Sequence, residues 1–195
     1  MIFHALTILR SQLQVYIEQI GGANDEVVLG NVALAGDQGN TALNDKLILS
    51  MVGIEEETTM RNSPSLRPST DGYAMAQPPL HVNVHLLLSA HYSTGTGTTP
   101  YENALTRLSQ AITFFQSKPL FNAYNSPGAN FSGLEKLTIE LQTLGLEQTN
   151  QLWGALGGRM VPAALYKVRM LIIDAGRISG TGPAIEIIQA NETKI

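Results

Sequence analysis

Apolar and polar residues alternate most clearly in the segment 80–91. Its apolar positions fall at every second residue, namely Leu80, Val82, Val84, Leu86, Leu88 and Ala90. A period of two places these side chains on one face of an extended chain, so the segment predicts a half-buried strand. A helix is expected next, over 100–117. Thr99 would be its N-cap, Pro100 its first residue, and Glu102 would complete a capping box.

The same patterns predict elements along the rest of the chain. Apolar residues at helical spacing predict two helices that each end at a pair of glycines, over 2–20 and 146–156. Extended patterns predict further strands, over 26–34, 44–55, 134–143 and 166–174, with a possible terminal strand over 184–189. The glycine-rich residues 36–40 suit a hairpin between the first two strands, and residues 176–183 are expected to form a turn.

This order of elements predicts an α+β fold. We expect a mixed, mostly antiparallel sheet of five to six strands, flanked by three helices. The 195 residues suit a single domain over 1–195. Residues 56–79 show no regular pattern and form a long irregular arm or loop. Because segments above about 15 residues without structure are usually functional or disordered, this arm is expected to become ordered on a partner.

Charged residues make up only 14% of the chain, while hydrophobic residues make up 44%. About 25% charged residues is usual in soluble proteins. Partners therefore cover part of the surface, or the surface is an ordinary one rich in glycine and threonine. The net charge is −4 and no run of Lys or Arg occurs, which disfavours nucleic acid as a partner.

The sequence shows no signal for secretion, membrane insertion or disulfide formation. The first ten residues lack the basic region and the cleavage site of a signal peptide. No apolar run approaches the roughly 20 residues that span a bilayer, so no membrane partner is expected. We therefore expect a soluble protein that is synthesised and assembled in the cytoplasm. The absence of cysteine excludes disulfides and thiolate metal sites.

Three groups of residues could carry chemistry, and none forms a convincing site. His81 and His85 share a strand face but lie about 13 Å apart along it, too far to bind one metal ion. Glu55–Glu57 are expected to form a solvated strand end, although paired carboxylates can perform acid–base chemistry. Ser93–Gly97 lack the lysine and the glycine spacing of a phosphate-binding loop. We therefore expect no catalytic residue, no cofactor and no metal.

Two features suit either a core or an interface. Trp153, the single tryptophan, is expected in the core of its helix, with a subunit interface as the alternative. Lys167 and Arg169 project from one strand face, which Leu171 and Ile173 continue. These cations mark a subunit contact or are ordinary surface residues. The candidate contacts with other subunits or with a tube are Arg61, Arg67, Tyr73, Lys167 and Arg169.

Several segments carry a resemblance to a known family. They are Pro78-Pro79 followed by Asn83, Leu134–Leu141, Leu146–Gly157 with its Leu-Trp pair, and Pro162–Met170 with Tyr-Lys-Val-Arg. Over roughly residues 6–173 the chain resembles the N-terminal domain of cap, or tube-terminator, proteins of contractile injection systems. These are the phage-tail-like particles of the antifeeding-prophage and Photorhabdus-virulence-cassette type.

The resemblance implies a function as well as a tail-terminator-like fold. It implies a structural, non-enzymatic cap that terminates the tube and sheath of such a particle. It also implies a ring of six copies, with the tube protein and the sheath protein as partners. A closed ring whose face does not propagate would stop the growth of a tube. An enzyme with a site built from loops, and a module that binds a small ligand or a peptide, remain the alternatives.

Overall fold

The computed structural model describes residues 1–24, 26–36, 41–57, 66–69, 72–76, 79–173 and 178–183. Its helices are α1 (Ile2–Gln19), α2 (Thr99–Ser117) and α3 (Leu146–Ala155). Its strands are β1 (Val27–Leu29), β2 (Lys46–Glu56), β3 (Leu66–Ser69), β4 (Gly72–Ala76), β5 (Leu80–His91), β6 (Leu120–Phe121), β7 (Leu137–Gln142), β8 (Ala163–Ile173) and β9 (Ile178–Pro183). Two short 3₁₀ helices, η1 (Val32–Leu34) and η2 (Thr41–Leu43), precede β2.

Six strands form the main sheet in the order β1-β2-β5-β8-β7-β6. All neighbours are antiparallel except β1 and β2, which are parallel. The predicted α+β class and mixed sheet are confirmed. The predicted hairpin between the first two strands is wrong, because parallel neighbours need a crossover connection. The first strand ends at Leu29, and the side chain of Asn31 accepts a hydrogen bond from the backbone N–H of Ala33 to begin η1.

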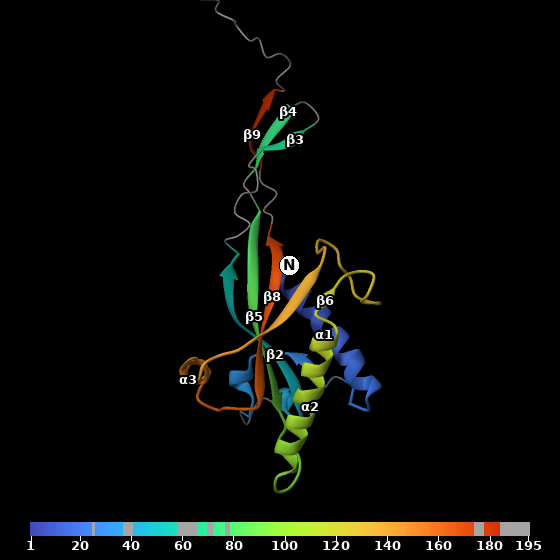
Figure 1. Cartoon of the computed structure of the whole chain (residues 1–195), viewed down its shortest axis with the longest axis vertical. Coiled ribbons are helices and arrows are strands. Elements are labelled where there is room, and N and C mark those ends of the chain that lie inside the picture. The colour runs from blue at the N-terminus through green and yellow to red at the C-terminus, as the bar shows by residue number, and fades with distance from the viewer. Residues whose placement is uncertain are drawn as a thin grey trace, which may run out of the picture.

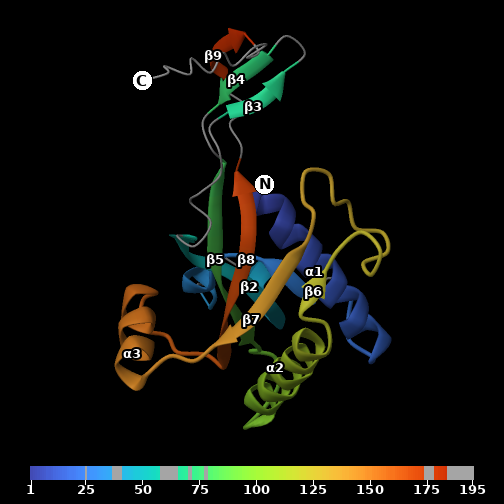
Figure 2. The same cartoon turned by 45° about the horizontal axis from the view of Figure 1, so that its top comes forward.

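The two faces of the main sheet are covered differently (Figures 1 and 2). On one face, α1 and α2 pack on the apolar positions of β5, which from Val82 to Ala90 are at most 3% exposed. The predicted alternation is thus confirmed from Val82 onward, whereas Leu80 at the start of the strand is 44% exposed. On the other face a smaller core joins α3 and η1 to Ile48, Leu87 and Leu165. This smaller core covers only part of the second face.

Helix boundaries follow the predicted signals, with one correction. Positive φ angles of 85° at Gly21 and 95° at Gly157 accompany the ends of α1 and α3, as the glycine pairs predicted. The predicted capping box of α2 is wrong, because the N-cap is Thr98 and already has helical backbone angles. Its hydroxyl instead donates a hydrogen bond of 2.7 Å to Oε1 of Glu102.

Strands β3, β4 and β9 form a separate three-stranded sheet in the order β3-β4-β9, here called the arm sheet. It lies beyond the ends of β5 and β8 (Figures 1 and 2). The segment 56–79 is therefore not irregular throughout, and residues 178–183 form a strand where a turn was predicted. The reason is that β4 pairs with β9, about 100 residues away along the chain, which a local pattern does not reveal. The predicted strand over 184–189 lies outside the described residues.

Candidate interface on the open face of the sheet

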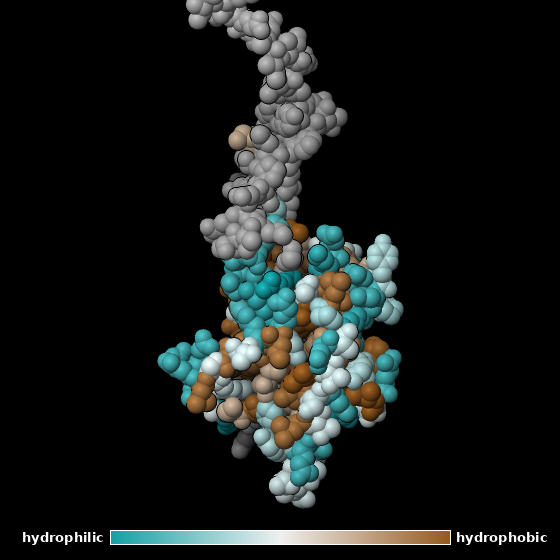
Figure 3. Space-filling model, in the orientation of Figure 1, coloured by the Kyte–Doolittle hydropathy of each residue, from teal (hydrophilic) through white to brown (hydrophobic). Residues whose placement is uncertain are grey.

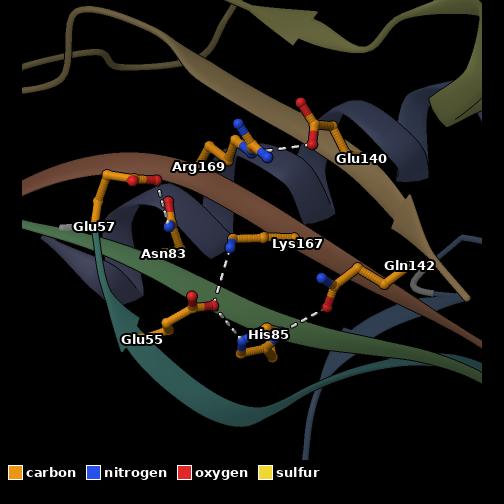
Figure 4. Close-up of polar contacts among 8 residues, drawn as sticks. All are labelled: Glu55, Glu57, Asn83, His85, Glu140, Gln142, Lys167 and Arg169. Atoms are coloured by element: carbon orange, nitrogen blue, oxygen red, sulfur yellow. Dashed lines mark hydrogen bonds and ion pairs between the residues drawn. The ribbon is translucent and has the colours of Figure 1, made fainter. Parts of the chain in front are cut away.

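The part of the second face that extends past the smaller core carries eight polar side chains, here called the open-face cluster (Figure 4). Its members are Glu55, Glu57, Asn83, His85, Glu140, Gln142, Lys167 and Arg169. The space-filling view shows a hydrophilic surface over this part of the sheet and a more hydrophobic surface toward the other end (Figure 3). The face is thus divided into a polar half and an apolar half.

The register of four strands brings the open-face cluster together. Lys167 on β8 lies directly opposite His85 on β5 and Glu140 on β7. Glu55 on β2 lies opposite Asn83 on β5. Residues directly opposite one another on antiparallel strands are close enough for their side chains to interact. The sequence separations exceed 25 residues in each pair, so only the folded sheet makes these contacts.

Lys167 and His85 converge on one carboxylate. The Nζ atom of Lys167 lies 2.9 Å from Oε2 of Glu55, and Nε2 of His85 lies 3.2 Å from the same oxygen. Nδ1 of His85 is 2.8 Å from Oε1 of Gln142. The Lys167 side chain is 13% exposed, whereas the Glu55 side chain is 51% exposed. The hydrogen bond and the charge of Lys167 hold the pKa of Glu55 below its ordinary value.

Two further pairs complete the open-face cluster. Nδ2 of Asn83 donates a hydrogen bond of 2.9 Å to Oε2 of Glu57. Nε of Arg169 lies 3.0 Å from Oε2 of Glu140, and both side chains are more than 40% exposed. Such exposed ion pairs contribute only about 0–1 kcal/mol to stability. An ordered pattern of alternating charges is better suited to selecting a partner than to holding the fold together.

The predicted continuation of the Lys167–Arg169 face by Leu171 is wrong. Val84 lies opposite Val168, whereas Val82 lies opposite Leu171, so β8 contains an extra residue between these pairs. Such a β-bulge shifts every later side chain to the other face. Leu171 is therefore buried against the helices, and Ile173 packs on the same core. The cations therefore stand on the face opposite Leu171 and Ile173.

The other predicted interface residues lie elsewhere. Arg67 is in β3 and Tyr73 in β4, so both belong to strands of the arm sheet. Arg61 lies outside the described residues. Trp153 is 7% exposed and belongs to the smaller core, which confirms the predicted core position. The structure thus brings Lys167 and Arg169 into one cluster and places Arg67 and Tyr73 in the arm sheet.

In the described ranges, no three residues of the types His, Cys, Asp and Glu are placed to hold a metal ion. The fully buried Asn83 separates His81 from His85 along β5. Within the described structure, His85 contacts the carboxylate of Glu55 and the amide oxygen of Gln142. Neither group is a nucleophile that the imidazole could activate as a base.

A buried polar network lies at the C-terminal end of α1. The carboxylate of Glu26, 3% exposed, accepts a hydrogen bond of 2.8 Å from the backbone N–H of Ala23 and lies 2.9 Å from Nε of Arg107. The hydroxyl of Tyr92 also donates to Glu26. Burial and this contact raise the pKa of Tyr92. The network satisfies a buried charge and joins the connection between α1 and β1 to α2, which is a structural role.

Apolar hollows beside α2 were not expected from the sequence. One, of about 480 Å³, lies between α2 and α3 and is lined by Tyr101, Leu105 and Trp153 among others. Another, of about 450 Å³, lies between α2 and β7. Tyr101 and Leu105 follow at helical spacing and remain exposed. That second apolar stripe on α2 was the one signal in the sequence that could have indicated these hollows.

No helix within the described part of the chain is long and apolar enough to cross a membrane.

Comparisons with known proteins agree with this architecture. Two solved structures are similar: the sheath/tube terminator of the extracellular contractile injection system PVC in its extended state, and the tube terminating cap of the anti-feeding prophage. The first has a TM-score of 0.61 at 11% identity, and the match covers 100% of this chain and 64% of the terminator chain. The second has a TM-score of 0.61 at 12% identity, and the match covers 97% of this chain and 59% of the cap chain.

At these identities the likeness shows the fold, and the chain spans about three fifths of the length of both proteins. A comparison with curated proteins gives no significant match. The profile of the family described as the Pvc16 N-terminal domain matches residues 4–187, which is nearly the whole chain. The chain therefore belongs to the Pvc16 N-terminal domain family.

Proposed function

We propose that this chain is a structural cap that terminates the inner tube and the sheath of a phage-tail-like contractile injection system. The family match over residues 4–187 carries the proposal. Two similar structures support it, since one is named a sheath/tube terminator and the other a tube terminating cap. The partners would be a tube protein and a sheath protein. Synthesis and assembly would take place in the cytoplasm, before the particle is released.

The cap would act as a closed ring of identical copies, with six favoured. A ring forms when copies associate head to tail and the rotation between them closes. The low charged fraction, 14%, supports a surface that other subunits partly cover. No catalysis is needed for this role, and we propose that the chain is not an enzyme.

Two surfaces would make the contacts. The open-face cluster presents Lys167 and Arg169 among carboxylates, which suits a partner with a complementary charge pattern. The segment 56–79 with its arm sheet, including Arg61, Arg67 and Tyr73, would reach past the main sheet toward the tube. Residues 1–195 would form one cap domain around these two surfaces.

Imaging of particles with and without this chain tests the proposal. We expect particles of uniform length with blunt ends when the chain is present, and uncapped or overlong tubes when its gene is deleted. Restoring the gene on a plasmid is the control. Particles with normal length and normal ends in the deletion strain would refute the proposed function.

Deletion of Thr59–Ala76 tests the contribution of the arm. The main sheet pairs without β3 and β4, so it should fold as before. We expect the far-ultraviolet circular dichroism of the main sheet to persist while capping is lost. If the deleted protein instead fails to unfold cooperatively, the segment is part of the core and not an arm for a partner.

A further inference from the structure

The two edges of the main sheet differ in how they are protected. On the β2 side, a bulge after Met51 and the charges of Glu55 and Glu56 interrupt the free part of the edge. Bulges and charges are common devices that prevent further strands from pairing. On the β7 side, β6 is only two residues long and pairs with Leu137 and Thr138. The unprotected edge is therefore the one at β7.

The second half of β7 has no strand on its outer side within the described structure. Beyond β6, the backbone N–H of Ile139 still bonds to the carbonyl of Pro119, at 2.9 Å. From Glu140 to Gln142 the only paired neighbour is β8. Leu141 lies in this stretch and is 59% exposed. An exposed apolar side chain on an unpaired edge is the usual place for a further strand to add.

A hollow suited to apolar side chains lies beside this edge. Its volume is about 450 Å³, and it is lined by Ile112, Phe115, Gln116, Pro119, Ile139, Glu140, Leu141 and Tyr166. One of these residues is charged, and most are apolar. When a strand adds to a sheet edge, backbone hydrogen bonds provide affinity, and pockets for alternate side chains provide specificity. The edge and the hollow together form a slot for an extended apolar segment, here called the β7 slot.

The chain itself contains one segment that fits the β7 slot. Four ranges of more than two residues lie outside the described structure: 37–40, 58–65, 174–177 and 184–195. The first three are mostly polar or contain glycine or proline, whereas the last begins Ala-Ile-Glu-Ile-Ile-Gln. β-branched apolar residues at this density are typical of a strand. We propose that residues 184–189 of a second copy add as a strand to β7 and insert Ile185 and Ile187, which share one face of a strand, into the β7 slot.

The segment cannot reach the β7 slot of its own chain. Leu141 lies opposite Tyr166, and β8 runs on from Tyr166 to Ile173, which is about 23 Å. The arm sheet, in which β9 ends at Pro183, lies still farther along that direction (Figure 1). Six residues span at most about 20 Å, so residues 184–189 would be used up before arriving. The exchange must therefore take place between copies.

Exchange of this kind is head to tail where each copy donates to one neighbour and receives from another, because the donor segment and the β7 slot are different surfaces. Head-to-tail contacts close into rings or continue as filaments. The inference rests on the self-association in the proposed function and names the contact that produces it. It does not depend on the number of copies.

Paired variants of the full chain test the exchange by sedimentation velocity. Leu141→Arg should block the β7 slot, and the double change Ile185→Glu with Ile187→Glu should block the donor segment. We expect the wild-type chain to form a closed oligomer and each variant alone to be a monomer. The control Leu146→Arg replaces a leucine that is 80% exposed on α3 and should leave the oligomer unchanged. Cooperative thermal unfolding of each variant would show that each one folds, whatever its midpoint, because association by itself raises the midpoint of an oligomer.

A mixture of the two blocked variants gives the sharpest result. One retains the donor segment and the other retains the slot, so they should form a 1:1 pair and nothing larger. Hydrogen exchange should show protection of the Leu141 amide in the wild-type oligomer and in this pair only. An oligomer that survives Leu141→Arg, or a wild-type chain that remains monomeric at its highest soluble concentration, overturns the inference. So does protection of Leu141 only within assembled particles, which would assign the slot to another protein.

Failure of this inference is distinct from failure of the proposed function. A cap whose ring survives both variants would still terminate tubes, and deletion of its gene would still change particle ends.

Discussion

Trp153 should hold α3 on the second face of the sheet, and its replacement measures that attachment. The side chain is 7% exposed and packs with the apolar residues Val32, Ala35, Leu43, Ile48, Leu87 and Leu165. Trp153→Ala removes about 150 Å² of buried apolar surface, which corresponds to about 4 kcal/mol. Two hollows border Trp153 and open to solvent, so part of the void can fill with water. We therefore expect a loss near the lower end of the usual range, about 3 kcal/mol.

Urea unfolding followed by circular dichroism is the suitable assay, because the variant loses the single tryptophan fluorophore. For a chain of this size a loss of about 3 kcal/mol lowers the thermal midpoint by about 10 °C. Leu146→Ala on the same helix is the control. That side chain is 80% exposed, so its loss should change stability by no more than about 0.5 kcal/mol. A loss below about 1 kcal/mol for Trp153→Ala would refute the smaller core as the attachment of α3.

Three further predictions follow from the polar groups. Lys167→Met should raise the pKa of the Glu55 carboxyl toward its ordinary value, as measured by carbon-13 NMR titration, and an unchanged pKa would exclude the ion pair. Burial raises the pKa of Tyr166 to about 12, so the stability that the protonated phenol provides should be complete below pH 10 and decline between pH 10 and 12. Urea unfolding should show that Tyr166→Phe flattens this decline. Ionisation of Tyr166 near pH 10 in the folded protein would contradict this prediction. Glu26→Gln should destabilise the protein by about 3 kcal/mol in urea unfolding, because the guanidinium of Arg107 loses the carboxylate that neutralises it. A change below about 1 kcal/mol would show that the polar network around Glu26 is not needed for stability.

Local patterns were sufficient for most of the main sheet and all three helices. The alternation in β5 correctly placed Val82 to Ala90 in the core. The glycines after α1 and α3 correctly ended those helices. These elements are determined by short-range spacing and capping, which a single sequence shows directly.

Long-range pairing explains what the sequence did not reveal. The parallel pairing of β1 with β2 and the antiparallel pairing of β4 with β9 depend on the whole fold, because the paired strands are not selected by local sequence. The bulge in β8 reversed the expected side of Leu171, since one extra residue reverses the alternation of a strand. β6 is only two residues long and carries no pattern of its own.

The interface could be predicted only in part. Lys167 and Arg169 were identified as cations on one strand face, and they do share a cluster. Their carboxylate partners were not identified, because Glu55 and Glu140 come from strands far away in the sequence. The sequence placed His85 on one strand face with His81, but its contact with Glu55 arises from the register of β2 and β5 and has no local signal.

Cryo-electron microscopy of the end of the assembled particle tests the central claim most directly. The account predicts a closed ring of copies of this fold, six in number, seated on the last ring of the tube and in contact with the end of the sheath. A particle end at which this chain is absent, or present as single copies bound along the sheath, would contradict it.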